Sequence, residues 1–306
     1  MNIQVFGHKA PDTDATGSPI IWAWYLSDVK GQPAEAKLLG EPNTEAAFVL
    51  SRWGVDKPAI IDDVAEGAPV VIVDTNNPDE LPASVNAADI LEIIDHHKLT
   101  GGLVTKGPIN ITVRAVACTA TILHDLMGAD AVKMPEAIKG TMLSCILSDT
   151  LEFRSPTTTD ADKALAEKLA GELGVAIPEL AAEMFAAKSD VSAFSDAELL
   201  RMDSKVGEFG PLKMRISVLE TTAPNVPLDR KASLMASMAT VSSEDSVDEV
   251  MLFVVDIIRE EATLLIPNER VKSIAEKSFG VSIDGDTVVL PGVMSRKKQI
   301  IPVLTV

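Results

Sequence analysis

The N-terminal segment from Ile3 to Asp14 has the sequence IQVFGHKAPDTD. The run at its start predicts a β-strand, and the polar turn that follows contains His8, Asp12 and Asp14. In open parallel sheets, ligands bind outside the carboxyl ends of the strands. This segment therefore predicts an α/β fold that begins with a strand, and a functional turn directly after that strand.

Short β-rich runs alternate with longer helical patterns up to about residue 186, which predicts an α/β domain with a parallel sheet covered on both faces. The expected strands are 3–6, 70–73, 90–94 and 109–113. The expected helices are 15–27, 44–53, 119–127, 135–146, 160–173 and 178–187.

The pattern breaks at the polar stretch 188–195, which we interpret as a linker. Residues 1–187 would form the first domain and residues 196–306 a smaller, mixed α/β domain. The length of 306 residues agrees with two domains of ~150 residues each, and two domains imply a cleft. In the second domain we expect strands at 212–218, 250–257 and 263–266, and helices at 228–239 and 269–277.

The formal net charge of −18 disfavours nucleic acid and anionic membranes as partners. A small polyanion can still bind where metal ions and a few basic side chains reverse the charge locally. Cys118 and Cys145 lie in apolar helical runs, and we expect reduced core thiols, which fits a cytoplasmic protein. We expect no signal peptide, and the longest apolar stretch, 250–258, is far shorter than the ~20 residues that cross a bilayer.

Three more groups of polar residues are expected at the same edge of the sheet as the N-terminal turn. Asp74 follows one predicted strand, Asp95-His96-His97 follows the next, and Asp149 follows a helical apolar run. An Asp after a strand is often only the N-cap of the next helix. Because carboxylates and imidazoles on several separate loops would converge on one edge, we favour a common site over separate caps.

These candidate ligands are oxygen and nitrogen atoms without thiolate, which suits Mn²⁺, Co²⁺ or Mg²⁺ better than a structural zinc ion. We expect manganese, and at least six candidate ligands favour two ions over one. Side chains of the adjacent His96 and His97 should point to opposite sides of an extended segment, so their roles should differ. One division that this permits is His96 as ligand and His97 as substrate contact or acid. His124 is most simply structural or exposed.

A short basic run, Ser295-Arg296-Lys297-Lys298-Gln299, lies between two apolar runs near the C-terminus. Taken alone, it is typical of a solvated turn. Opposite a site with two metals, Arg296 and Lys297 would bind phosphate oxygens, because a guanidinium presents a fork of donors and an ammonium a compact charge. The sequence around Lys205 contains no motif that indicates a function, and taken alone this lysine would be interpreted as a surface residue.

Together, GHKAPDTD at 7–14, Asp74, the DHH triplet at 95–97, Asp149 and SRKKQ at 295–299 closely resemble the manganese-dependent family II inorganic pyrophosphatases of the DHH phosphoesterase superfamily. The resemblance implies a Rossmann-like DHH domain, a smaller substrate-binding domain and an active site in the cleft between them. It implies a homodimer that hydrolyses pyrophosphate to two phosphates by attack of a hydroxide bridging two metal ions. We expect Mn²⁺ at these two positions, Co²⁺ as an alternative, and Mg²⁺ accompanying the substrate.

The resemblance also implies roles for the candidate residues. It gives two overlapping ligand sets, one of His8, Asp12, Asp74 and Asp149 and the other of Asp14, Asp74, His96 and Asp149. Asp74 and Asp149 would therefore bridge the ions, and with Asp14 and His97 they form the expected catalytic set. Asp95 would steady its neighbours. The expected substrate contacts are His97, Lys205, Arg296 and Lys297.

The nearest alternative function is another DHH phosphoesterase that acts on short oligonucleotides, cyclic dinucleotides or polyphosphate. DHH phosphoesterases that act on nucleotides typically carry a glycine-rich motif with histidine in the second domain, and this sequence has no such motif. A catalytically silent metal- or phosphate-binding module would need a missing ligand, and none of the expected ligands is missing. Phosphate release from pyrophosphate, polyphosphate and a dinucleotide would separate these alternatives.

Overall fold

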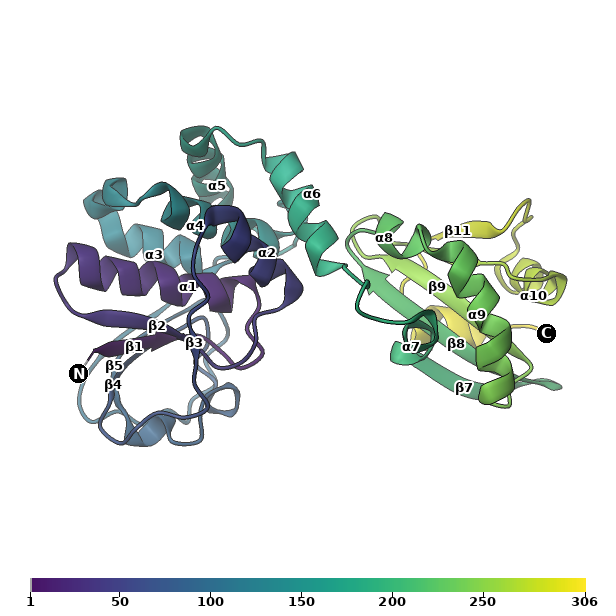
Figure 1. Ribbon diagram of the computed structural model, residues 1–306, viewed down its shortest axis with the longest axis horizontal. Helices are drawn as coiled ribbons and strands as arrows, with labels where there is room; N and C mark the ends of the chain where they lie inside the picture. Colours follow the sequence, from purple (N-terminus) through teal and green to yellow (C-terminus); the bar gives the residue numbers. More distant parts are fainter. Residues whose placement is uncertain (1) are drawn as a thin grey trace. The chain divides into compact units, whose positions relative to one another are not determined.

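A computed structural model describes the structure of residues 2–306. The chain forms two compact units, of which the first ends at Lys188 and the second begins at Ser189 (Figure 1). Each unit has its own sheet and hydrophobic core. The predicted linker, 188–195, falls between the helices α6 (Ile177–Lys188) and α7 (Asp196–Met202), with its first residue still inside α6.

The first unit contains a six-stranded sheet in the order β3-β2-β1-β4-β5-β6, and every neighbouring pair of strands is parallel. The parallel α/β fold predicted for this region is confirmed. The two strands at one edge, β2 and β3, were not predicted. The strands are β1 (Ile3–Phe6), β2 (Ala34–Leu38), β3 (Ala59–Ile60), β4 (Pro69–Val73), β5 (Asp89–Asp95) and β6 (Asn110–Val113).

The α-helices of the first unit lie on one side of this sheet (Figure 1). Loops and two short 3-10 helices cover the other face, where Val64, Leu81 and Val85 pack in one cluster with Val70 and Ile72. Both faces are therefore covered, but only one of them by α-helices. The remaining helices of this unit are α1 (Thr13–Trp24), α2 (Thr44–Trp53), α3 (Thr119–Met127), α4 (Glu136–Thr150) and α5 (Asp160–Leu173).

Helix α1 begins inside the N-terminal polar turn and packs closely on α4. Asp12 caps its start, because the carboxylate accepts a hydrogen bond from the backbone N–H of Ala15 at 3.0 Å. A Cβ atom on Gly17 would lie 2.3 Å from the Sγ atom of Cys145, so only glycine allows this approach. Cys145 and Cys118 are free and buried, as predicted for core thiols. The packing brings the start of α1 close to the end of α4.

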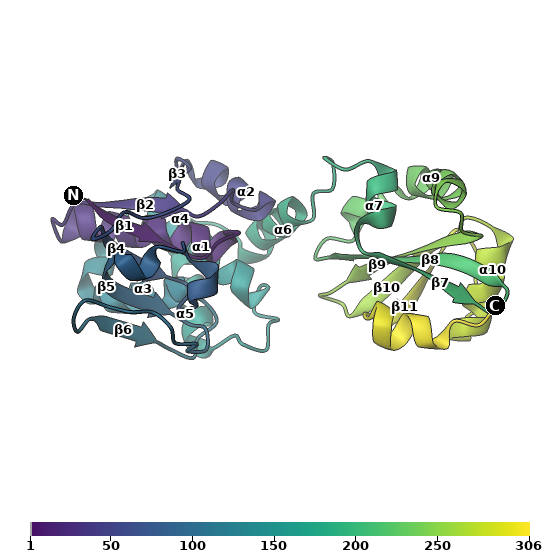
Figure 2. The same cartoon turned by 90° about the horizontal axis from the view of Figure 1, so that it is seen from below.

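The second unit contains a mixed five-stranded sheet in the order β11-β10-β9-β8-β7, in which only β8 and β9 are parallel. Its central strand is buried on both faces: Leu252 and Val254 pack with α7 and α9, and Met251 and Phe253 pack with α10 (Figure 2). The predicted mixed sheet is confirmed, although its two outer strands were missed. The elements are β7 (Ser204–Phe209), β8 (Leu212–Thr221), β9 (Glu249–Asp256), β10 (Glu261–Leu265), β11 (Thr287–Pro291), α8 (Asn225–Leu228), α9 (Lys231–Glu244) and α10 (Glu269–Phe279).

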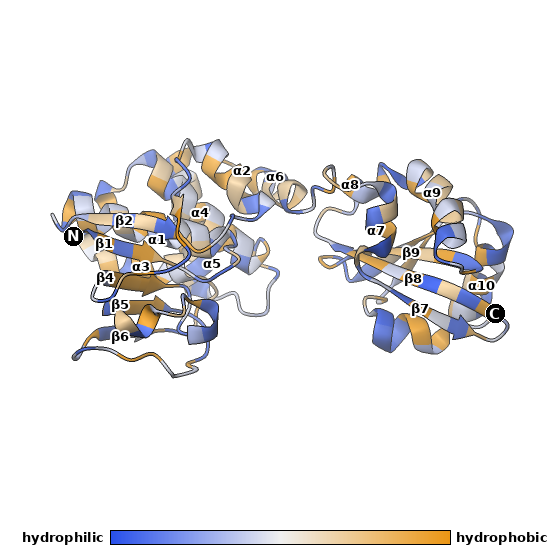
Figure 3. Ribbon diagram, turned by 60° about the horizontal axis from the view of Figure 1, so that its bottom comes forward, coloured by the Kyte–Doolittle hydropathy of each residue, from blue (hydrophilic) through white to orange (hydrophobic). Residues whose placement is uncertain are grey.

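Hydrophobic residues are concentrated in the central strands, as the colours of β4 and β5 in Figure 3 show. Within residues 2–306, no helix is both long enough and apolar enough to cross a membrane.

Candidate metal centre

The candidate ligands of the first unit surround Asp74, which directly follows β4 and is 1% exposed. Its backbone φ of 59° lies in the left-handed region, which Asp and Asn adopt more readily than most residues. Histidines from the ends of two other strands face its two carboxylate oxygens. The Nε2 atom of His8 lies 3.6 Å from Oδ2, and the Nε2 atom of His96 lies 3.3 Å from Oδ1.

Three overlapping groups of side chains could each hold a metal ion. In each group, one ligand atom per residue lies within 4.8 Å of the others. The first group is His8, Asp12 and Asp74, and the second is Asp14, His96 and Asp149. The third group, Asp74, His96 and His97, shares a residue with each of the other two, so all six predicted ligands lie in one cluster with His97 beside them.

Asp149 lies in the last turn of α4 and not in a loop after the helix, as the predicted helix end at residue 146 had implied. The helix continues to Thr150, four residues beyond its predicted end at residue 146. The polar residues Ser148 and Asp149 suggest a helix end in the sequence, but here they are polar because they face a buried site. The helix ends one residue later, where Leu151 adopts a left-handed φ of 48°.

His96 and His97 do not point to opposite sides, so that prediction is wrong. Their ring centroids lie 4.2 Å apart. The reason is that β5 ends at Asp95 and the chain bends at both histidines, so the alternation of an extended segment no longer applies. The two rings nevertheless differ in exposure: the side chain of His96 is 16% exposed and that of His97 is 52% exposed.

Hydrogen bonds fix the orientation of both rings. The Nδ1 atom of His96 lies 3.2 Å from the carbonyl oxygen of Val116, which leaves Nε2 directed at Asp74. The Nδ1 atom of His97 lies 2.9 Å from Asp95, whose carboxylate also accepts both histidine backbone N–H groups. This hydrogen bond to Asp95 raises the pKa of His97, because it favours the protonated ring.

Two residues that the sequence does not single out, Thr119 and Ser18, donate hydrogen bonds to the carboxylates. Thr119, at the start of α3, donates its backbone N–H to Asp14 at 2.7 Å and its hydroxyl to Asp74 at 3.0 Å. Ser18 donates its hydroxyl to the other oxygen of Asp14 at 2.5 Å. A Thr at a helix start is common, so nothing in the sequence marked Thr119 as part of the site.

The electrostatics of the cluster fit bound cations. Burial, and then the negative charge of Asp14, raises the pKa of both Asp74 and Asp149 well above the usual range. The Oδ2 atom of Asp149 is buried and, within residues 2–306, has no hydrogen-bond partner. Such a carboxylate needs a positive partner. Oxygen and imidazole ligands without thiolate suit Mn²⁺, so the residues present fit manganese.

Manganese affinity should fall as the pH drops below 9. Burial lowers the pKa of His8, but the hydrogen bond to Asp12 and further acidic and carbonyl neighbours raise it more, to about 9. Below that pH the ring must lose a proton before it can bind metal, so affinity should drop about tenfold per pH unit. Calorimetric titration at pH 6.5 and 8.5 measures this slope, which should be shallower in His8→Gln. Equal wild-type affinities at both pH values would contradict it.

Apart from His97, the predicted substrate residues belong to the second unit. Lys205 lies in β7 and is exposed, as is Lys297. The guanidinium Nη1 atom of Arg296 lies 2.7 Å from Asp203, so this arginine is ion-paired in the free protein. The basic run adopts a fixed conformation, because the side-chain oxygen of Gln299 accepts two backbone N–H groups.

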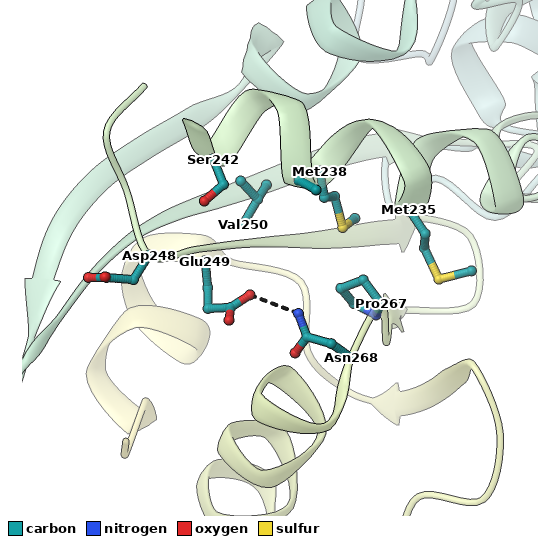
Figure 4. A pocket seen from close by; sticks show the side chains of 9 residues that line it. Met235, Met238, Ser242, Asp248, Glu249, Val250, Pro267 and Asn268 are labelled. Carbon is teal, nitrogen blue, oxygen red and sulfur yellow. Dashed lines mark hydrogen bonds between the residues drawn. The ribbon is translucent and has the colours of Figure 1, made fainter. Parts of the chain in front are cut away.

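A separate cavity of about 410 Å³ lies in the second unit, between α9, β9 and the start of α10 (Figure 4). Glu249 at its wall accepts a hydrogen bond from Asn268 at 3.0 Å and pairs with Arg270 at 3.3 Å. Asn268 in turn caps α10. The polar groups of the wall therefore hold the fold together, and the cavity gives no sign of chemistry.

Comparison with known proteins assigns the class. Residues 2–148 match the DHH family, N-terminal domain, and residues 182–306 match the DHHA2 domain. The parallel α/β unit with the Asp-His cluster is thus a DHH domain, and the mixed-sheet unit that follows it is a DHHA2 domain.

Proteins that align with nearly the whole chain identify the family within this class. Proteins assigned as manganese-dependent inorganic pyrophosphatases from Lactobacillus acidophilus and Deinococcus radiodurans are 35% and 38% identical; the alignments cover 98% and 99% of this chain and 97% of each relative. A solved structure from Methanococcus jannaschii, assigned to the family II inorganic pyrophosphatases, is 34% identical, with a TM-score of 0.61 over 98% of this chain and 97% of that one. The chain belongs to the manganese-dependent, family II inorganic pyrophosphatase family.

Proposed function

We propose that this chain hydrolyses pyrophosphate to two phosphates as a cytoplasmic, manganese-dependent homodimer. The observation that carries the proposal is the cluster of six carboxylate and imidazole side chains, Asp74 among them, in a chain that matches pyrophosphatases along its whole length. Co²⁺ is an alternative metal, and Mg²⁺ would accompany the substrate.

Two manganese ions would be held by the first two groups, with Asp74 and Asp149 shared between them. When bound, such ions lower the pKa of a coordinated water and offset negative charge on phosphate oxygens. The side chains of this chain supply the remaining requirements. Thr119 and Ser18 hold the carboxylates in place before any ion arrives, so the site does not have to reorganise during the reaction.

His97 is suited to give a proton to the departing phosphate. Asp95 holds its Nδ1–H and raises its pKa, so the ring keeps its second proton, on Nε2, at a higher pH than a free histidine would. Half of the side chain is exposed, which leaves the ring accessible to a substrate. Asp95 acts through His97 and His96 and needs no contact with substrate.

Lys205, Arg296 and Lys297 would bind the phosphate oxygens. In the free protein Arg296 is paired with Asp203, whose side chain is 57% exposed. A phosphate oxygen would take the place of this carboxylate, because both present anionic oxygens to the same guanidinium fork. The basic side chains then offset substrate charge that the metal ligands, themselves acidic, would otherwise repel.

Arg296→Ala should lower kcat/KM about ten- to a hundredfold, because a charge-assisted hydrogen bond is worth roughly 1.5–3 kcal/mol. Arg296→Lys should recover only part of the loss, since an ammonium keeps the charge but not the fork. Lys298→Ala, in the same turn, is the matched control and should change little. Steady-state kinetics with manganese content checked would decide; wild-type efficiency in Arg296→Ala means that the run is only a solvated turn.

The proposed activity is tested by phosphate release from pyrophosphate, polyphosphate and a dinucleotide, each with manganese and with magnesium alone. We expect pyrophosphate with manganese to react fastest by far. Comparable or faster release from the dinucleotide or polyphosphate would instead assign the chain to another DHH phosphoesterase activity. Manganese should act better than magnesium, because His8 and His96 add nitrogen ligands that magnesium binds poorly.

A further inference from the structure

The side chain of Glu45 is a buried carboxylate to which none of the roles above is assigned. It lies in the first turn of α2 and is 0% exposed. We propose that Glu45 is a positioning residue that holds the metal ligands of α1 and α4 together and thereby sets the affinity for manganese. This inference rests on the proposed function, since it concerns the same metal centre.

One oxygen of Glu45 joins the two segments that carry ligands. Its Oε2 atom accepts the hydroxyl of Thr13 at 2.9 Å and the hydroxyl of Ser148 at 2.7 Å. Thr13 lies between two predicted ligands at the start of α1, and Ser148 directly precedes Asp149 on α4. Three of the six ligands are therefore adjacent in sequence to a hydroxyl that Glu45 holds.

The amino group of Lys188 lies 3.3 Å from the same Oε2 atom. A buried carboxylate is costly unless it is paired and hydrogen-bonded, and Lys188 supplies the pairing. The start of α2 also favours a negative charge, because backbone N–H groups are exposed there. Lys188 is the last residue of the first unit, so the contact also ties the end of α6 to the metal centre.

The physical reason for such an anchor is repulsion between the ligands themselves. Asp14 on α1 is buried, and burial together with the negative charge of Asp14 raises the pKa of the Asp149 carboxyl on α4, because two like charges repel. Without a metal, this repulsion favours separation of the two helix ends. Glu45 opposes the separation through the two hydroxyls, so the ligands are already close when manganese arrives.

The packing of α2 on α4 does not depend on Glu45 alone. Trp53, at the other end of α2, donates its ring N–H to Ser144 of α4 at 3.0 Å. A Cβ atom on Gly140 would lie 2.1 Å from the ring of Trp53, which shows how closely the two helices meet there. Loss of the Glu45 charge should therefore change the metal site more than the fold.

The test is the affinity of Glu45→Gln for manganese, measured on the full chain by calorimetry after chelation. We expect a dissociation constant about ten- to a hundredfold higher than that of wild type, as for other residues that orient metal ligands. Thermal unfolding of the metal-free variant should stay close to wild type. Glu41→Gln is the matched control, because Glu41 is also ion-paired, with Lys57, but is exposed. It should bind manganese as wild type does.

A purely structural role predicts the reverse pattern, with a lower unfolding temperature and unchanged manganese affinity, and that result would overturn the inference. If Glu45→Gln does not fold, Thr13→Val and Ser148→Ala each remove one hydroxyl and keep the carboxylate. Both should weaken manganese binding, and wild-type affinity in both would overturn the inference as well. A wild-type chain that binds no manganese would instead refute the proposed function, and the inference with it.

Discussion

Asp74→Asn should lower the turnover of pyrophosphate about a thousandfold or more and abolish stoichiometric manganese binding. The Asp74 carboxylate lies within 3.6 Å of both His8 and His96, so the substitution removes a negative charge that both histidines face. Metal ions contribute several kcal/mol to catalysis, and each ~1.4 kcal/mol is a factor of ten in rate. Asn retains the side-chain shape and tolerates the left-handed backbone at this position. Phosphate release and bound manganese are the measurements.

The same substitution should stabilise the metal-free protein. The pKa of Asp74 is raised on folding, so the wild-type chain loses stability as the pH rises from about 3.9, the unfolded value, through the folded pKa. An amide removes this penalty. At neutral pH we therefore expect metal-free Asp74→Asn to unfold at a higher temperature than metal-free wild type, and manganese to stabilise only the wild type. Asp62→Asn, at an exposed position, is the control. Normal activity in Asp74→Asn would contradict its proposed role.

Replacement of the two adjacent histidines should have different effects. His97→Gln should lower turnover by about a hundred- to ten-thousandfold, the contribution of a general acid, and leave manganese content near normal. His96→Gln should lose manganese, because the nitrogen that faces Asp74 is removed. Manganese content and kcat of both variants are measured together.

His124→Gln provides the matched control for this comparison. His124 lies in α3 and belongs to none of the three candidate metal groups, so both manganese content and turnover should stay at wild-type values. Equal loss of manganese in His97→Gln and His96→Gln would mean that the hydrogen bond to Asp95 does not give His97 a separate role.

Much of the first unit could be predicted, because local signals and tertiary structure agree there. Asn43 caps the start of α2 and Gly54 adopts the left-handed φ of 64° at its end, so its predicted bounds match the structure. Strand β2 was missed for the opposite reason. Its sequence, AEAKL, consists of residues that favour helices, and its strand conformation comes from parallel pairing with β1.

The candidate ligands could be predicted from the sequence because Asp and His carry recognisable chemistry after apolar runs. The positions of these ligands relative to one another could not be predicted, since the bend after β5 and the extension of α4 are set by packing. Thr119 and Glu45 were also missed. Both residue types are common in the first turn of a helix, and only the fold shows that Thr119 contacts the candidate ligand Asp74 and that Glu45 contacts Ser148, next to Asp149.

The most direct test of the metal centre is the anomalous scattering of manganese in crystals of the manganese-loaded protein. We predict two peaks in each chain, both within bonding distance of Asp74 and Asp149, one of them also beside His8 and the other beside His96. A single peak, or manganese bound away from Asp74, would contradict the two-metal site.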